Sequence, residues 1–243
     1  MKTKLFAGLS LLMMFSLAGC GLIPAINDII PSGGGEDSIS DDYDPDEIGQ
    51  KLNTLRVQSG YSFNYEIVTT DDGETDRTSL TYATKNDLYY FMDEDGDEMY
   101  WDLTSETSYD VYSKNAGETV WGKETYNYED YSTTKQEIRT ITSTYVVGWF
   151  SYYSAYGDLG ATKTQTSFLG RSCDKYTMSQ RIVTVGATVS YSYECIIDQQ
   201  LGVCFKWTFS ASGATATESG SGSVNFECKA FSTNPTITLP VVA

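Results

Sequence analysis

The fold class follows from one stretch of the chain, VSYSYECIIDQQLGVCFKWTF, which occupies residues 189–209. On both sides of a central turn, large apolar residues alternate with small or charged ones. The residues that share the apolar phase are Val189, Tyr191, Tyr193, Cys195, Ile197, Val203, Phe205, Trp207 and Phe209. A period of two is typical of β-strands with one covered and one solvated face. Since residues 198–202 favour a tight turn, the sequence predicts two antiparallel strands of a large sheet.

The same period recurs over most of the chain. Tyr61, Phe63, Tyr65 and Ile67 alternate with polar residues, and Tyr, Thr, Val and Trp are frequent beyond them, as suits half-buried strands. Further strands are predicted at 77–84, 87–92, 98–104, 107–113, 118–127, 162–168, 171–179, 182–197, 203–210 and 222–231. Residues 210–223 are rich in Gly, Ser, Thr and Ala and are predicted to form a flexible loop. The sequence therefore predicts a mainly β (α+β) protein.

Two segments have helical spacing. Asp44 is a good N-cap, Pro45 suits the first turn, and Ile48 and Leu52 recur at helical spacing before Gly60 ends the run. This predicts an amphipathic helix over about 45–58. Residues 133–156 also carry a helical stripe, although their β-branched residues disfavour a helix. A helix is favoured there, with a strand as the alternative.

The N-terminus carries a targeting signal. Lys2 and Lys4 precede an apolar run, and Leu17-Ala18-Gly19-Cys20 resembles the bacterial lipobox. The run is too short to cross a bilayer of about 30 Å. We expect residues 1–19 to be a lipoprotein signal peptide and Cys20 to carry a lipid that anchors the chain to the bacterial cell envelope. Because Gly21 follows Cys20, the expected address is the outer membrane if the cell is Gram-negative. An ordinary signal peptide with an incidental cysteine is the alternative.

A tether separates this anchor from the folded part. Residues 20–44 contain Pro, a run of three Gly and many acids, a composition that extends rather than packs. Residues 45–240 are expected to form a single β domain. The acidic clusters at 36–47 and 93–98 lack the ligand spacing of a calcium loop, and the second lies between two predicted strands. We therefore expect a turn at 93–98 and no metal site.

Composition excludes several classes of function. The chain has no histidine, which rules out catalysis by Ser-His-Asp or Cys-His groups. Its 33 acidic and 16 basic residues give a net charge of −17, which opposes nucleic-acid binding. No phosphate-binding loop or nucleophile motif is present, and no pair of carboxylates stands out. The sequence predicts neither an enzyme nor a cofactor.

Four cysteines follow Cys20, namely Cys173, Cys195, Cys204 and Cys228. Outside the cytoplasm an even count favours structural disulfides. Cys195 and Cys228 share the apolar phase of their strands and Cys173 and Cys204 the polar phase, which suggests the pairs Cys173–Cys204 and Cys195–Cys228. In a simple meander these partners would be two strands apart, beyond disulfide reach. The connectivity therefore stays open.

Three segments together resemble a known family. They are the predicted helix 45–58 running into the strand at 61–67, the sequences LGRSCDKYTM (169–178) and YECIIDQQLGVCFKW (193–207), and the ending VNFECKAFSTNPTITLP (224–240). They are similar to the LolA/LolB-like superfamily of periplasmic lipoprotein carriers and related lipid-binding lipoproteins. The resemblance implies a large curved antiparallel sheet or unclosed barrel, with one or two helices covering a concave, apolar face that receives acyl chains.

The leading functional hypothesis is a lipid-anchored extracytoplasmic protein that binds a lipid or other hydrophobic ligand in an apolar cavity. The candidates for the cavity wall are Phe63, Tyr65, Met99, Trp101, Tyr191, Tyr193, Phe205 and Trp207. Aromatic residues at period two are also the ordinary content of a protein core. The alternative is a cell-surface glycan- or protein-binding module, which the 19 tyrosines and runs such as 126–128 and 152–153 favour.

Overall fold

The structure is a computed structural model that describes residues 45–93, 95–128, 161–217 and 219–242. The predicted signal peptide, Cys20, the tether and the segment 133–156 lie outside these ranges. The described elements are α4 (Pro45–Gln58), β1 (Tyr61–Asp71), β2 (Glu74–Lys85), β3 (Leu88–Met92), β4 (Glu98–Asp102), β5 (Ser108–Lys114), β6 (Gly122–Asn127), β7 (Thr162–Phe168), β8 (Arg171–Thr184), β9 (Ala187–Asp198), β10 (Cys204–Thr215) and β11 (Ser219–Ser232). The predicted helix at 45–58 is confirmed. Within the described ranges, no helix is long and apolar enough to cross a membrane.

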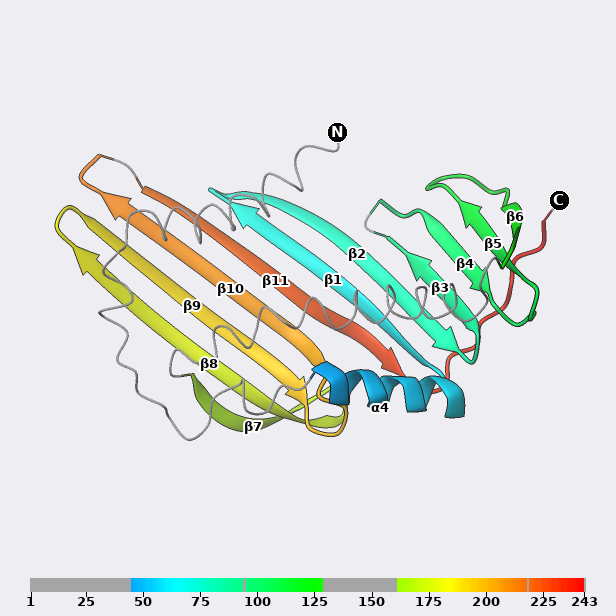
Figure 1. Cartoon of the computed structure of the whole chain (residues 1–243). Coiled ribbons are helices and arrows are strands. Elements are labelled where there is room, and N and C mark those ends of the chain that lie inside the picture. Colours follow the sequence, from blue (N-terminus) through cyan, green and yellow to red (C-terminus); the bar gives the residue numbers. More distant parts are fainter. Residues whose placement is uncertain (1–44, 94, 129–160, 218, 243) are drawn as a thin grey trace.

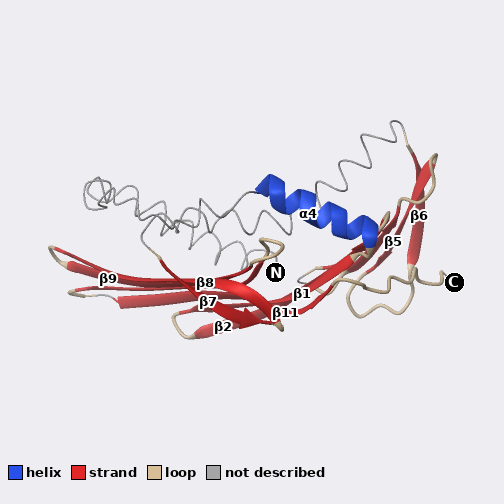
Figure 2. Cartoon of the chain, turned by 90° about the horizontal axis from the view of Figure 1, so that it is seen from below, coloured by secondary structure: helices blue, strands red, loops and turns tan. Residues whose placement is uncertain are grey.

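All strands of the described ranges belong to one antiparallel sheet of 11 strands, in the order β6-β5-β4-β3-β2-β1-β11-β10-β9-β8-β7. Each arm is a meander, and the pairing of β1 with β11 joins the two arms (Figure 1). β6 and β7 are the edges, so the sheet is open rather than a barrel. Figure 2 shows that the sheet is curved and that α4 lies on its concave side. The predicted fold class is confirmed.

Three strand predictions need correction. The predicted strand 182–197 is two strands, because Val185 and Gly186 turn the chain between β8 and β9. β6 begins at Gly122, later than the predicted 118. Residues 210–223 are not a loop, because β10 continues to Thr215 and β11 begins at Ser219. Their low strand propensity is overridden by backbone pairing with neighbouring strands on both sides.

One face of the sheet is lined by apolar side chains and the other by polar ones. The strand register shows this, because directly paired residues lie on the same face. One row crosses five strands as Tyr176, Cys195, Trp207, Phe226 and Ile67. A neighbouring row on the opposite face crosses six strands as Ser179, Ser192, Ser210, Ser223, Thr70 and Thr75. The apolar face packs against α4 and is therefore the concave face; the other is the convex face.

α4 closes one end of the concave face. Near its N-terminus Ile48 packs against Gly202 in the β9–β10 turn, where an added Cβ would lie 2.8 Å from Cγ1 of Ile48. Near its C-terminus the buried Arg56 donates hydrogen bonds to the Asn86 carbonyl and to Asp87 in the β2–β3 turn. The helix therefore spans from the β9–β10 turn to the β2–β3 turn and leaves the far end of the long strands uncovered by it (Figure 1).

Candidate ligand-binding face

The eight predicted cavity residues lie on one face of the sheet. Met99 and Trp101 reach Phe63 and its neighbours through β3 and β2, by the rows Met99–Phe91–Tyr82–Phe63 and Trp101–Tyr89–Thr84–Tyr61. On the other arm, Trp207 lies opposite Cys195, and Tyr193 lies opposite Phe209. The Phe205 ring is 5.4 Å from that of Phe231, which pairs with Phe63. The structure thus gathers residues that lie far apart in the sequence onto the concave face.

Four of these residues are part of the packed core. Phe63, Tyr65, Tyr193 and Phe205 are buried, and the rings of Phe63 and Tyr65 stack at 5.6 Å between their centroids. The Tyr65 ring also stacks on Phe226 at 4.3 Å. These side chains already fill their space with protein contacts and form the floor of the concave face.

The other four are half-buried and form the accessible part of that floor. Met99, Trp101, Tyr191 and Trp207 keep part of their surface exposed. Sequence reasoning did not single out other half-buried residues of this face, which are Ile67, Phe91, Phe209 and Phe231. Their signal was present, since Ile67 and Phe209 share the apolar phase of their strands. Together these side chains form a broad apolar surface beside α4.

The polar groups within this floor are held neutral. The Tyr65 hydroxyl donates a hydrogen bond of 3.1 Å to the Cys204 carbonyl, and burial raises the pKa of this phenol well above its ordinary value. Burial also raises the pKa of the Cys228 thiol to about 12. At neutral pH these groups therefore remain protonated, and the floor carries little charge.

The four cysteines do not form the predicted structural disulfides. All four are buried free thiols, and no disulfide is present in the described part of the chain. Cys173 on β8 and Cys204 on β10 are separated by β9, and Cys195 on β9 and Cys228 on β11 are separated by β10. The members of each suggested pair are therefore two strands apart, as expected for a meander. The two sulfur atoms that do approach are those of Cys195 and Cys204, at 3.5 Å on adjacent strands.

The turn at 198–202 fixes the end of the floor that contacts α4. Asp198 is buried and accepts hydrogen bonds from the Leu201 backbone amide at 2.7 Å and from the Arg171 Nε at 2.7 Å. Gly202 has a φ of 73°, a conformation that favours glycine, and it lies under Ile48. The predicted turn is confirmed, and it sets where the helix begins its path over the sheet.

The convex face is held by ion pairs instead. Glu194 on β9 lies 2.5 Å from the Lys175 ammonium on β8 and 3.0 Å from that of Lys206 on β10. Farther along the face, Glu66 pairs with Arg77 at 2.9 Å and with Lys229 at 3.7 Å. Partly exposed charges paired across strands are typical of a solvated face. This contrast makes the concave face the candidate for an apolar ligand.

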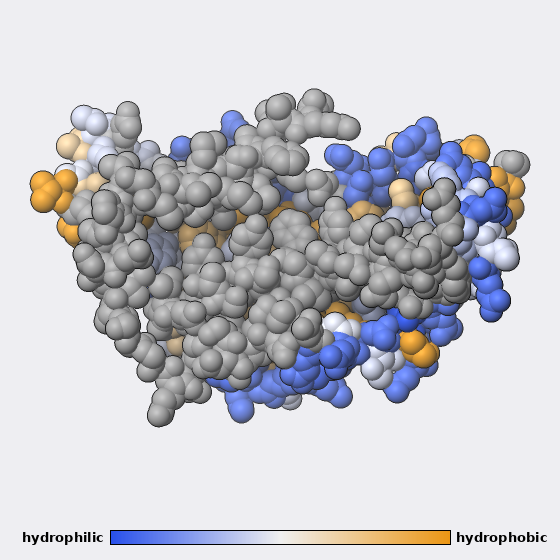
Figure 3. Space-filling view, in the orientation of Figure 1, coloured by the Kyte–Doolittle hydropathy of each residue, from blue (hydrophilic) through white to orange (hydrophobic). Residues whose placement is uncertain are grey.

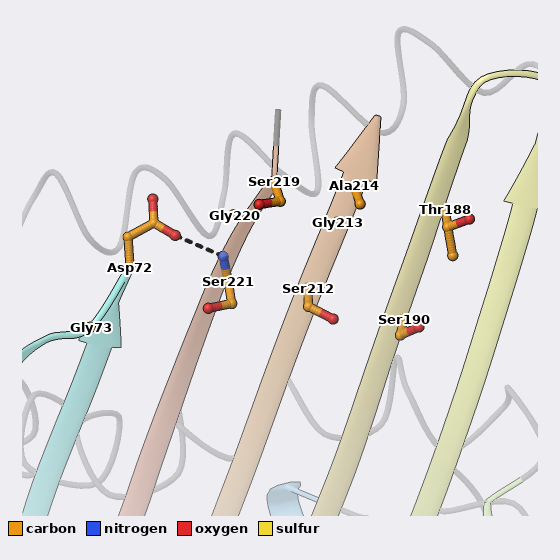
Figure 4. A pocket seen from close by; sticks show the side chains of 10 residues that line it. All are labelled: Asp72, Gly73, Thr188, Ser190, Ser212, Gly213, Ala214, Ser219, Gly220 and Ser221. Atoms are coloured by element: carbon orange, nitrogen blue, oxygen red, sulfur yellow. Dashed lines mark hydrogen bonds between the residues drawn. The ribbon is translucent and has the colours of Figure 1, made fainter. Parts of the chain in front are cut away.

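One groove among the described residues lies on the opposite face of the sheet from the predicted residues. It is a shallow groove of about 580 Å³ at the tips of the long strands, lined by small polar residues such as Ser190, Ser212 and Ser221 (Figure 4). These serines alternate with the concave residues of their strands, so the groove lies on the convex face. Asp72 bounds it and accepts a hydrogen bond of 2.8 Å from the Ser221 amide. Its lining offers backbone and hydroxyl groups and contains no large apolar side chain.

The acidic cluster at 93–98 is a turn, as predicted. The Asp93 carboxylate accepts hydrogen bonds from the backbone amides of Asp95 and Asp97, at 3.0 and 2.9 Å. Among the described residues, no group of three or more Cys, Asp or Glu side chains is placed to hold a metal ion. Of the predicted tyrosine runs, Tyr126 is exposed and stacks on Tyr109, whereas 152–153 lie outside the described residues.

No protein-family model matches the chain, and no curated protein matches it. Three solved structures show a loose likeness. PNGF-II is 10% identical over 73% of this chain and 28% of its own, with a TM-score of 0.23. A DUF1329 family protein from Desulfovibrio piger is 7% identical over 75% of this chain and 90% of its own, with a TM-score of 0.23. A putative outer membrane lipoprotein-sorting protein domain from Vibrio parahaemolyticus is 10% identical over 76% and 90%, with a TM-score of 0.17. TM-scores this low do not support any conclusion about function. The function is therefore inferred from the side chains of this chain alone.

Proposed function

We propose that this chain is a lipid-anchored protein of the bacterial cell envelope that binds a lipid or another hydrophobic molecule on its concave face and catalyses no reaction. One observation carries the proposal. Half-buried large apolar side chains, among them Trp101, Trp207 and Phe231, gather on the concave face, while hydroxyls and ion pairs occupy the convex face of β8, β9, β10 and β11. An apolar surface on one side of a sheet is typical of binding faces, which supports the proposal.

The dimensions of the face suit an extended apolar chain. The row from Tyr176 through Trp207 to Ile67 crosses five neighbouring strands, a distance of about 19 Å at the usual strand spacing. Each methylene group that leaves water for this surface contributes about 0.8 kcal/mol. Because the floor carries little charge, it discriminates against ions and favours acyl chains or comparable hydrophobic molecules.

The location is proposed from the sequence. Lys2, Lys4 and the motif ending at Cys20 predict export followed by lipid attachment, and an acidic tether links this anchor to the sheet. A chain of net charge −17 is repelled by anionic headgroups, so the acyl groups would provide the anchoring. A protein held in this way meets hydrophobic ligands at the membrane surface.

The first test is native mass spectrometry of the purified chain followed by organic extraction. We expect copurified lipid at near-stoichiometric occupancy. Titration with a fluorescent fatty acid then measures affinity, and Trp207→Ala should weaken binding about tenfold or more because it removes much of the apolar contact. Trp121→Ala is the matched control, since Trp121 packs edge-on against Tyr100 on the convex face. An apo mass with no response to added lipid, or equal losses in both variants, would contradict the proposal.

The alternative to lipid binding is a cell-surface glycan- or protein-binding module. An aromatic cluster on the convex face favours the glycan-binding form. Tyr100 alternates with Met99 and Trp101 and contacts Tyr90 and Trp121, with ring centroids 4.6 and 5.2 Å apart. The Glu98 carboxylate and the Lys114 ammonium beside these rings are 2.5 Å apart and offer polar contacts. Aromatic rings with polar neighbours can stack on sugars. Glycan binding that Trp121→Ala abolishes, while Trp207→Ala leaves it intact, would select this candidate.

A further inference from the structure

The tip of the β8–β9 hairpin exposes apolar side chains that no described part of the chain covers. Val185 occupies the two-residue turn with Gly186 and is 107% exposed, and Val183 beside it is 68% exposed. Figure 3 shows hydrophobic residues gathered at the end of the molecule where Figure 1 places this tip. Large apolar side chains at the far end of a hairpin add nothing to the core, and their exposure to water is unfavourable.

The tip also differs in charge from the rest of the chain. Residues 175–193 contain no Asp or Glu, although acids number 33 in the whole chain, and the charged residue nearest the turn is Arg181. The β1–β2 tip at the same end of the sheet carries Asp71, Asp72 and Glu74 around Gly73. An apolar, acid-free tip can approach a lipid surface, whereas an acidic tip is repelled by anionic headgroups.

The apolar residues of this hairpin continue from the tip to the core. On the concave face, exposure falls along β9 from Val189, which is exposed, through Tyr191, which is half-buried, to Tyr193, which is buried. On β8, Ile182 lies opposite Val189, and the buried Met178 lies opposite Tyr193. The hairpin therefore carries one apolar strip that begins at the tip and ends in the floor of the concave face.

We propose that the β8–β9 tip is a membrane-contact site, at which Val183 and Val185 enter the apolar layer of a lipid bilayer. A bilayer is the partner whose chemistry fits, because the tip offers apolar area without a shaped pocket and without the acids found elsewhere. The contact would bring the end of the concave strip close to the membrane. It does not depend on whether the concave face holds a ligand.

The test is flotation of the mature chain, residues 20–243, with phosphatidylcholine vesicles. It carries Cys20→Ala so that neither the signal peptide nor an attached acyl group contributes. We expect the chain to bind, and the double substitution Val183→Ser and Val185→Ser to lower the bound fraction at least about tenfold. The matched control is Val120→Ser with Val241→Ser, since these valines are 61% and 91% exposed at other places on the surface. The control pair should bind as well as the unsubstituted chain. Circular dichroism checks that each variant is folded.

Other outcomes overturn the proposal. They are no binding to vesicles, equal binding by both double variants, or binding that requires anionic lipid and disappears in salt, which would show an electrostatic contact through Arg181. Fatty-acid titration separates this site from the concave face. The tip variant should keep its affinity for fatty acid, so loss of vesicle binding with intact ligand binding distinguishes the two sites.

Discussion

The concave and convex faces are built from the same strands, yet different forces hold them. On β9 the buried Tyr193 is followed by Glu194, which is paired with two lysines across neighbouring strands. On β10 Phe209 follows Thr208, whose hydroxyl donates a hydrogen bond of 2.8 Å to the Asn225 side chain. Alternate residues of one strand thus lie in the apolar core and on the solvated face. Burial of apolar side chains on the concave face contributes far more stability than ion pairs and hydrogen bonds on the convex face.

The largest effect is expected from the core of the concave face. Phe205 is fully buried and contacts both Phe168 and Phe231. Phe205→Ala should lower the free energy of unfolding by about 3–5 kcal/mol, because it removes the apolar contact and leaves a cavity. Ser210→Ala on the convex face should change it by about 0.5 kcal/mol or less. Urea denaturation measures both, and equal effects would erase the distinction between the faces.

A smaller effect is expected at the turn that links the floor to α4. Asp198→Asn removes the charge that pairs with Arg171 while keeping an oxygen for the Leu201 amide. We expect a loss of about 1–3 kcal/mol, less than for a fully buried pair because Arg171 is partly exposed. Thermal unfolding measures the loss. No change would mean that the ion pair does not stabilise the turn.

Gly202→Ala tests how closely α4 approaches the sheet. The new Cβ would lie 2.8 Å from Ile48 Cγ1, and the positive φ is unfavourable for alanine, so we expect a loss of about 1–2 kcal/mol. Combining it with Ile48→Ala should give less than the sum of the two single losses, because the contact is then absent. A strictly additive double mutant would show that the helix does not press on this turn.

The smallest effect is expected on the convex face and depends on pH. Partial burial acts to raise the pKa of the Glu194 carboxyl, but hydrogen bonds from Lys175 and Lys206 outweigh it, so the pKa lies below its ordinary value of 4.5. A lowered folded-state pKa means that the carboxylate stabilises the fold fully above pH 4.5 and loses this contribution as the pH falls through the folded-state pKa. Glu194→Gln should cost about 1 kcal/mol or less at pH 7 and nothing at acidic pH. A difference that grows on acidification would contradict the ion pairs.

Sequence alternation predicted which residues face inward, because a period of two maps directly onto the two faces. It placed all eight candidate aromatic and Met residues on one face, from Phe63 on β1 to Trp207 on β10. It failed where the pleat is interrupted. The register shifts between Cys204 and Lys206, so Cys204, assigned to the polar phase, is buried beside Cys195.

Pairing between residues far apart in the sequence explains the other differences between the sequence-based predictions and the structure. The glycine- and serine-rich residues 210–223 have weak strand propensity. Pairing of β10 with β11, and of these two strands with β9 and β1, holds them in the sheet. The contact of Ile48 with Gly202 likewise joins residues far apart in the chain, which local patterns do not report. The resemblance to lipoprotein carriers anticipated the curved open sheet with a helix on its concave side, but ligand binding stays a prediction.

The most direct test of a ligand on the concave face compares two tryptophans on opposite faces. Of the four tryptophans, Trp207 lies on the concave face, whereas Trp121 packs on Tyr100 of the convex face. Two variants, each retaining one of these and carrying Phe at the other three positions, are titrated with a brominated fatty acid, which quenches indole fluorescence on contact. We predict saturable quenching of Trp207 and none of Trp121. Equal quenching of both, or quenching of Trp121 alone, would contradict binding on the concave face.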